Sequence, residues 1–259
     1  MRRNARQHGF SLLETLLAVS TLAVGMLFVG GTFMTGIYLA TVSTERTIAT
    51  VVADEALAKI RLYGIIDPNL TADECTPYTE LVSIPASEMG YPSMDPNDAN
   101  SVPQYSWDAL CRRLGPDSQL AQVTVFVSRL NGSNARYWVR DPNSEELEQT
   151  QMPRAVRIKV LQESGDEEDE LTIGDAVDSD ETDEYLFVND GATLIDAKTG
   201  EIYRVLERYV DPPEQIRLDR PWEGDVLAEP DGGWVWVIPK PVEGGRSPGV
   251  AIYQEVVRF

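Results

Sequence analysis

Apart from carboxylates, few residues in this chain could carry out chemistry. The 259 residues include one histidine, His8, and two cysteines, Cys75 and Cys111, against 42 aspartates and glutamates. These numbers exclude four-cysteine and histidine-rich zinc sites, and they leave little for catalysis by imidazole. A hydrolase that uses a pair of carboxylates remains formally possible, but no such pair stands out among 42 acids. We therefore expect no cofactor.

The densest group of carboxylates lies between Glu163 and Glu184, where 12 residues are acidic and none is basic. Hard cations bind clustered carboxylates, which makes Asp178, Asp180 and Asp183 candidate calcium ligands. Their spacing does not match an EF-hand loop, because the glycine at the sixth position and the glutamate at the twelfth are missing. A solvated acidic linker between two folded units is the favoured interpretation.

The overall charge excludes one class of partner. With 22 basic residues the chain has a formal charge of −20, whereas binding to nucleic-acid phosphates needs a basic surface. The length allows one or two domains, and 42% hydrophobic residues is enough for a core.

Apolar residues are concentrated near the N-terminus. The apolar segment begins at Phe10, contains Glu14, and is then uncharged over residues 15–44. A helix needs about 20 residues to cross a membrane, so this segment can span one, and it is too long for a cleaved secretory signal. Three arginines precede it, which predicts a cytoplasmic N-terminus and an exported C-terminal part. A carboxylate at such a depth costs at least ~2.5 kcal/mol, which indicates a function for Glu14.

The run Gly9-Phe10-Ser11-Leu12-Leu13-Glu14, with its basic leader and long apolar stretch, resembles the class III signal of type IV pilins and pseudopilins. The resemblance implies that a membrane prepilin peptidase cuts after Gly9 and N-methylates the new terminus, Phe10. It also implies that Glu14 supports filament assembly. The residues agree, because a carboxylate in lipid needs a cation, and the Phe10 ammonium of a neighbouring subunit could reach this depth. A glutamate that snorkels or is protonated, with no role, is the alternative.

The helix is predicted to continue beyond the membrane. Ile48, Val52, Ala56 and Ile60 repeat at helical spacing, and Gly64 supplies a stop. We expect one helix over residues 10–63, spanning the membrane at about 10–39 and amphipathic beyond. Residues 47–61 are similar to minor pilins and pseudopilins of the PilV and GspI kind. Small residues at 31, 32, 35 and 36 would let helices approach closely in lipid.

Residues 64–120 are rich in proline and are predicted to form a long loop, with one short helix over 107–114. Cys75 and Cys111 both fall in this loop. A region with little regular structure gains stability from a cross-link, and an exported compartment permits one. A disulfide is therefore favoured over two free thiols, although spacing alone does not fix the distance between them.

The rest of the chain is predicted to be rich in strands. Alternating apolar residues indicate strands at 123–127, 137–139 and 156–160, with a hairpin turn at Asn131-Gly132. Turn residues then separate six further short strands, which suggest a small barrel or sandwich. Trp222, Trp234 and Trp236 could form an exposed platform for a ligand, but a place in the core is favoured. The six strands are expected at 185–188, 193–196, 202–207, 216–218, 234–238 and 250–257.

These elements predict an α+β protein in which a long N-terminal helix packs on an antiparallel sheet, followed by a small all-β unit. The expected division is a leader at 1–9, a helix at 10–63, a pilin-type head at 64–162, an acidic linker at 163–184 and a β-rich unit at 185–259.

The resemblance implies a structural subunit, a minor pilin or pseudopilin of a type IV filament or a type II secretion pseudopilus. It would be a single-pass inner-membrane protein with a periplasmic head. Its partners would be sibling pilins, the prepilin peptidase, an inner-membrane platform protein and membrane lipid, and not nucleic acid. One alternative is a binding or adhesion module that a filament displays. Another is a membrane-anchored enzyme, which is disfavoured because cleavage would remove His8, the one histidine.

Overall fold

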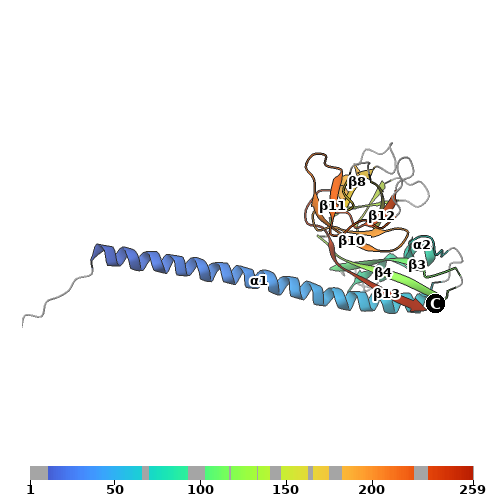
Figure 1. Ribbon diagram of the computed structural model, residues 1–259. Coiled ribbons are helices and arrows are strands. Elements are labelled where there is room, and N and C mark those ends of the chain that lie inside the picture. Colours follow the sequence, from blue (N-terminus) through green and yellow to red (C-terminus); the bar gives the residue numbers. More distant parts are fainter. Residues whose placement is uncertain are drawn as a thin grey trace, which may run out of the picture. The chain divides into compact units, whose positions relative to one another are not determined.

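A computed structural model covers residues 1–259. The chain divides into two compact units, Met1–Thr47 and Ile48–Phe259, and the long helix α1 (Leu12–Tyr63) contributes to both (Figure 1). The structure describes residues 11–65, 70–92, 103–116, 118–132, 134–140, 147–162, 166–174, 183–224 and 233–258.

Helix α1 has a residue-specific signal at each end. The Ser11 side-chain oxygen accepts a hydrogen bond from the Glu14 N–H at 3.2 Å, which caps the first turn. The helix stops where the Gly64 N–H donates to the Ile60 carbonyl at 2.9 Å, with a Gly64 φ of 78°. Glycine adopts this left-handed conformation without the steric cost of a Cβ. From Leu12 onward, the helix confirms the predicted range 10–63.

In the unit Met1–Thr47, α1 exposes large apolar side chains along its length. Its most apolar window of 18 residues has a mean hydropathy of 2.1 and none of it is buried. Threonine hydroxyls donate to carbonyls of the preceding turn, as Thr35 Oγ1 does to the Gly31 oxygen at 2.9 Å. Within the described ranges, α1 is the one helix that is long and apolar enough to cross a membrane.

The unit Ile48–Phe259 contains an antiparallel sheet in the order β1-β3-β4-β13, with β2 also paired to β3. The last strand of the chain therefore pairs with β4, far from it in sequence. The bounds of these strands are β1 (Thr76–Pro77), β2 (Gly90–Tyr91), β3 (Tyr105–Arg113), β4 (Leu120–Arg129) and β13 (Gly249–Arg258).

One face of the sheet packs on the C-terminal part of α1. The helix contributes buried residues at a helical spacing, and the strands contribute every second residue, so that the two surfaces meet in one apolar core. The predicted amphipathic half-helix is confirmed. The core residues are Ala49, Val52, Ala53, Ala56, Leu57 and Ile60 from α1, Trp107, Ala109 and Cys111 from β3, and Ala121, Val123, Val125 and Val127 from β4.

A closed antiparallel barrel follows, in the strand order β10-β11-β8-β7-β12-β9. Alternate residues of its strands fill the interior, including Val156, Ile158 and Val160, which are at most 1% exposed. The predicted small barrel or sandwich is thus a barrel. Its strands are β7 (Val156–Leu161), β8 (Glu170–Gly174), β9 (Thr193–Asp196), β10 (Ile202–Arg208), β11 (Gln215–Leu218) and β12 (Gly233–Val237).

The barrel packs on the second face of the sheet, opposite α1. Leu110 and Phe126 of the sheet lie in one buried cluster with Ile195 and Trp236 of the barrel. Figure 1 shows β3, β4 and β13 between the end of α1 and the barrel. This unit therefore has three layers, helix, sheet and barrel.

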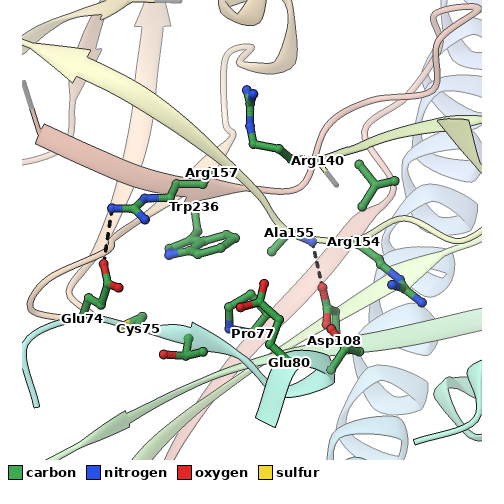
Figure 2. A pocket seen from close by; sticks show the side chains of 13 residues that line it. Glu74, Cys75, Pro77, Glu80, Asp108, Arg140, Arg154, Ala155, Arg157 and Trp236 are labelled. Atoms are coloured by element: carbon green, nitrogen blue, oxygen red, sulfur yellow. Dashed lines mark hydrogen bonds and ion pairs between the residues drawn. The ribbon is translucent and has the colours of Figure 1, made fainter. Parts of the chain in front are cut away.

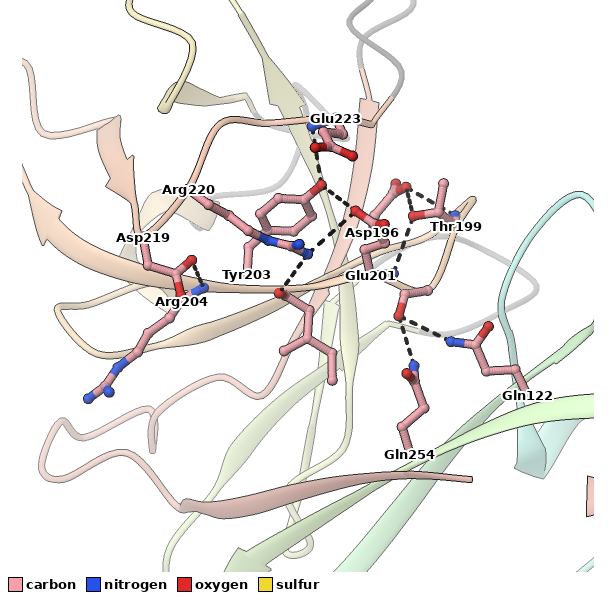
Figure 3. A network of polar contacts seen from close by, with 12 residues as sticks. Gln122, Asp196, Thr199, Glu201, Tyr203, Arg204, Asp219, Arg220, Glu223 and Gln254 are labelled. Carbon is pink, nitrogen blue, oxygen red and sulfur yellow. Dashed lines mark hydrogen bonds and ion pairs between the residues drawn. The ribbon is translucent and has the colours of Figure 1, made fainter. Parts of the chain in front are cut away.

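The turn between β9 and β10 fixes the barrel to the sheet (Figure 3). The Asp196 carboxylate accepts hydrogen bonds from the Thr199 N–H at 3.0 Å and the Thr199 hydroxyl at 2.5 Å, which shape the turn. The Gly200 carbonyl then accepts from Gln254 Nε2 of β13 at 2.9 Å and Gln122 Nε2 of β4 at 3.4 Å. Two sheet strands thereby hold one barrel turn.

The remaining elements are short. Strands β5 and β6 form a separate antiparallel pair that lies between β4 and β7 in the sequence. An ion pair links α1 to η1, since the Lys59 ammonium lies 3.1 Å from the Glu88 carboxylate. The bounds are α2 (Tyr78–Leu81), the 3-10 helices η1 (Ala86–Met89) and η2 (Glu184–Phe187), β5 (Tyr137–Arg140) and β6 (Leu147–Thr150).

Three predicted features are wrong. The short helix expected over 107–114 falls in strand β3, whose apolar residues at 105, 107, 109 and 111 alternate at the spacing of a strand. The strand expected over 185–188 is the 3-10 helix η2. The expected hairpin at Asn131-Gly132 does not pair its flanking strands either, because β4 pairs with β3 and β13 while β5 pairs with β6.

The strand order also corrects the expected division of the head. Strand β7, expected in the head at 64–162, belongs to the barrel, and β13, expected in the C-terminal unit at 185–259, belongs to the sheet. The expected linker at 163–184 contains the barrel strand β8. The barrel is therefore an insertion between β4 and β13. Alternation of apolar residues identifies a strand but not its partner, which is why the sequence did not reveal this arrangement.

Candidate functional site

The residues of the predicted processing signal lie at the start of the chain. Gly9 and Phe10, the expected cleavage and methylation sites, lie outside the described residues. Glu14 lies in the first turn of α1 with an exposed side chain. In the described part of the chain, its carboxylate makes no hydrogen bond or ion pair. An isolated carboxylate is thus present at the start of an apolar helix.

The same unit has a shallow groove of about 730 Å³ along one side of α1. Gly31, Thr32, Thr35 and Gly36 are among its lining residues, and a Cβ added at either glycine would meet nothing within 4 Å. The small residues predicted to allow close helix approach therefore lie together on the helix surface.

Cys75 and Cys111 are both buried free thiols, which corrects the favoured disulfide. Thr76, the residue after Cys75, pairs directly with Cys111. Because neighbouring residues of a strand point to opposite faces, Cys75 packs in the cluster beside the barrel while Cys111 packs in the core beside α1. Burial raises the pKa of the Cys75 thiol to about 12 and also raises that of Cys111.

Of the three calcium candidates, the structure describes Asp183 alone. Asp178 and Asp180 lie outside the described residues, while Asp183 precedes η2 with an exposed side chain. Among the residues that the structure describes, no group of three or more histidine, cysteine, aspartate or glutamate side chains could hold a metal ion.

The three tryptophans take different places. Trp222 is 7% exposed and packs against Tyr203 in the barrel core, with tilted rings whose centroids are 4.6 Å apart. Trp234 is half-buried beneath the Arg157 guanidinium, at 4.6 Å. Trp236 is 8% exposed and faces the sheet. The favoured placement in the core is thus confirmed for Trp222 and Trp236.

A pocket of about 380 Å³ lies where the sheet meets the barrel (Figure 2), and we call it the sheet–barrel pocket. Its lining combines carboxylates and guanidinium groups around the indole of Trp236, which lies across its centre. Pockets between packed parts of a fold are common ligand sites. The lining residues are Glu74, Cys75, Thr76, Pro77, Thr79, Glu80, Asp108, Val139, Arg140, Arg154, Ala155, Arg157 and Trp236.

Each guanidinium in the pocket has an acidic neighbour. Arg157 forms an ion pair with Glu74 at 3.3 Å, and Arg140 forms one with the buried Glu184. Arg154 acts electrostatically on Asp108, and its positive charge partly offsets the rise that desolvation causes in the pKa of that carboxyl. The three cations are therefore already balanced within the protein.

Asp108 is the deepest acid of the pocket, at 4% exposure. Its two oxygens accept backbone hydrogen bonds from the Ala109 and Ala155 N–H groups, each at 2.9 Å. Desolvation is the largest influence and raises the pKa of Asp108, although these bonds oppose it. The side chain links β3 of the sheet to the residue before β7 of the barrel.

Sequence reasoning did not identify Glu80, Asp108 or Arg154 as site residues. They come from separate segments, and they are brought together by the packing of barrel on sheet. A weak signal was present at Asp108, a charged residue between Trp107 and Ala109 in the segment that was predicted to be a short helix.

No protein-family model, no curated protein and no solved structure matches this chain. The chain's own residues and geometry are therefore the basis for assigning a function.

Proposed function

We propose that this chain is a minor pilin or pseudopilin, a structural subunit of a type IV filament or of a type II secretion pseudopilus. In this proposal prepilin peptidase cuts after Gly9 and N-methylates Phe10. The protein is a single-pass inner-membrane precursor with a cytoplasmic N-terminus and a periplasmic head. Its work is structural, and it acts on no substrate.

The observation that carries the proposal is the isolated carboxylate of Glu14. Glu14 lies in the first turn of α1, and residues 15–44, which follow it, carry no charge. Its side chain has no partner in the described part of the chain. A carboxylate in hydrocarbon is unfavourable unless a cation or a proton accompanies it. The N-terminal ammonium of a neighbouring subunit, at Phe10 after cleavage, would supply that cation at a matching depth.

The arrangement of the rest of the chain supports the same proposal. α1 continues from an apolar, exposed part into a part that packs on an antiparallel sheet. The groove at Gly31, Thr32, Thr35 and Gly36 offers a surface where the helix of a sibling subunit could approach closely. The partners in this proposal are sibling pilins, prepilin peptidase, a platform protein of the inner membrane and lipid.

Processing is the first test. The mature protein should begin with N-methylated Phe10, and the loss of Arg2, Arg3 and Arg6 should change its formal charge from −20 to −23. Intact-mass analysis of protein purified from membranes measures both changes. A mature terminus at another residue, or an uncut Met1, would overturn the proposal.

Assembly is the second test. Glu14→Ala should insert and be cleaved normally, because the change removes a carboxylate from an apolar segment. A neighbour's ammonium would then lack its counter-charge, at a cost of about 3–5 kcal/mol, so incorporation should fall more than about a hundredfold. Glu14→Gln should fail similarly. The measurement is the ratio of this protein in sheared filaments, or in cross-linked complexes with sibling pilins, to that in the membrane.

Thr21→Ala is the matched control, because it removes another polar group from the same helix. The Thr21 hydroxyl donates to the Leu17 carbonyl at 3.0 Å within the helix, so its loss should leave incorporation unchanged. If Glu14→Ala enters complexes as well as the wild type, the chain is better described as a membrane-anchored protein.

A second candidate function is the display of a binding module. The barrel is inserted between β4 and β13, and the ends of the insertion lie together, since Asn131 Nδ2 donates to the Arg246 carbonyl at 2.8 Å. Removing residues 133–245 would delete the barrel and keep both flanking strands. Retained incorporation with lost surface adhesion would favour display, whereas lost incorporation would favour a role for the barrel in assembly.

A further inference from the structure

The sheet–barrel pocket has one carboxylate that the protein leaves unbalanced. Glu74 is paired with Arg157, and Asp108 has two backbone donors and the nearby Arg154. In the described part of the chain, Glu80 makes no hydrogen bond or ion pair. Its side chain is exposed, and partial desolvation together with the charges of Glu74 and Asp108 raises its pKa. The Arg157 guanidinium opposes this shift, but it is already paired with Glu74.

The pocket also has an unused donor. Trp236 is 8% exposed, and its indole N–H has no acceptor among the described residues. Figure 2 shows the ring across the pocket, with its nitrogen on the side of Glu74 and Cys75. A buried indole N–H normally finds a partner, and leaving such a donor unpaired is unfavourable by about 1–3 kcal/mol. An oxygen atom of a ligand would relieve this cost.

An unbalanced carboxylate beside an aromatic ring is a suitable environment for an organic cation. The carboxylate attracts the charge, and the indole face stabilises it through the cation–π interaction. A cavity of about 380 Å³ has room for an amino-acid side chain or a small amine. An anion is disfavoured, because each guanidinium already has an acidic neighbour.

We propose that the sheet–barrel pocket binds an organic ammonium group, whose charge pairs with Glu80 beside the Trp236 ring. Where the ammonium belongs to a lysine residue, a backbone oxygen of the same ligand accepts the hydrogen bond of the Trp236 indole N–H, whereas a simple amine binds through its charge alone. The ammonium comes either from a lysine residue of a polypeptide or from a free small amine. This site is independent of the proposed filament function, since all its residues lie within the unit Ile48–Phe259.

The test uses the full chain in a non-ionic detergent, labelled with ¹⁵N at the tryptophan indoles. The five tryptophans give separate indole N–H signals, and Trp236→Phe identifies the relevant one. The probe is N-acetyl-lysine methylamide, which has an ammonium and carbonyl oxygens. The Trp236 signal should shift and saturate, while the norleucine analogue, which lacks the charge, should bind at least about tenfold more weakly.

Butylamine distinguishes the two sources of the ammonium. It has the charge but no oxygen, so affinity equal to that of the lysine probe identifies a site for small amines, and weaker affinity identifies a lysine side chain. Either result supports the proposal, provided that the Trp236 signal responds.

Glu80→Gln tests the assigned residue. It should weaken binding of the lysine probe by about tenfold or more, while Glu243→Gln, at an exposed carboxylate elsewhere on the head, should leave binding unchanged. Equal binding by Glu80→Gln and wild type would overturn the proposal. The proposal would also be overturned if the Trp236 signal shifted with neither amine, or if it shifted equally with the norleucine analogue. These two results remain decisive even if Glu80→Gln fails to fold.

Discussion

The two units of the chain use apolar residues in opposite ways. In Met1–Thr47 they are exposed, with Leu12 at 80% and Phe28 at 72%. In Ile48–Phe259 apolar side chains fill three buried clusters, one between α1 and the sheet, one inside the barrel and one between the sheet and the barrel. The first unit therefore needs a surrounding that the chain does not supply, whereas the second buries its apolar surface by itself.

The two units also differ in how a carboxylate is placed, as Asp108 and Glu14 show. Asp108 is buried, and two backbone N–H groups occupy its oxygens. Glu14 lies in the first turn of the apolar helix, is exposed, and has no partner in the described part of the chain. Buried polar groups are usually satisfied inside a fold, as Asp108 is. The proposed function gives Glu14 a partner outside its own chain, so the two acids differ in where their partners are expected.

The unit Ile48–Phe259, which we call the head, should need its last strand, β13, in order to fold. Two deletions test this, and we expect the largest effect here. Ending the chain at Gly245 removes β13, which pairs with β4 along nine residue pairs. We expect the head to lose cooperative unfolding altogether, because β4 and α1 lose their neighbour. Removing residues 133–245 instead should preserve cooperative unfolding.

The internal deletion needs one adjustment, since it uncovers the face of the sheet beneath the barrel. Leu110 and Phe126 are at most 2% exposed there, so both should be replaced by threonine. Circular dichroism during thermal unfolding compares the two deletions. If the chain that ends at Gly245 folded, β13 would be dispensable. The sheet would then not depend on a strand that follows the barrel in the sequence.

Asp108→Ala should have the next largest effect. The change leaves the buried Ala109 N–H and the partly buried Ala155 N–H without acceptors, which should lower the free energy of unfolding by about 1–3 kcal/mol. The loss should grow as the pH falls. Because the folded pKa of Asp108 is raised, its stabilising protonated form is present below that pKa and is lost as the pH rises through it.

Urea unfolding of wild type and Asp108→Ala between about pH 4 and pH 7 measures this difference. Other acids contribute equally to both proteins, so they cancel in the comparison. If the difference in the free energy of unfolding between wild type and Asp108→Ala became smaller toward acid pH, the folded state would favour the ionised carboxylate. Asp108 would then behave like an ordinary paired acid.

Local elements were largely predictable from the sequence, whereas their assembly was not. The range of α1 and the positions of β4, β7 and the barrel strands from β9 to β12 follow from the spacing of apolar residues. Strand β3 was missed although its apolar residues at 105, 107, 109 and 111 alternate, because it lies in a proline-rich segment that was interpreted as a loop with one short helix.

The candidate sites divide in the same way. Glu14 was identifiable because a charge within an apolar run is visible in the sequence itself. Glu80 and Trp236 were not paired by sequence reasoning, because their proximity depends on the insertion of the barrel between β4 and β13. The disulfide was wrong for a related reason, since the register of β1 and β3 decides which face each thiol occupies.

Gly200→Ala should have a smaller effect, at the contact between barrel and sheet. Gly200 has a φ of 73°, and an added Cβ would lie 2.8 Å from Gln122 Nε2. Strain and crowding together should cost about 1–2 kcal/mol. Gly245→Ala is the matched control, because its φ of 116° is also left-handed but nothing lies within 4 Å of the added Cβ. If both variants lose the same stability in thermal unfolding, the turn does not hold the barrel.

The smallest effect is expected at the thiols, which should not react while the head is folded. Burial suppresses the thiolate, the form that reacts with alkylating agents, since the pKa of Cys75 is raised to about 12 and that of Cys111 is also raised. The two side chains occupy opposite faces of the sheet, so oxidation to a disulfide would require β1 to leave its register. Iodoacetamide should therefore modify neither cysteine in native protein and both in denaturant without a reductant, as intact mass would show. Denatured, non-reduced protein that takes up no label would demonstrate a disulfide, and the register between β1 and β3 would then have to differ from the one described.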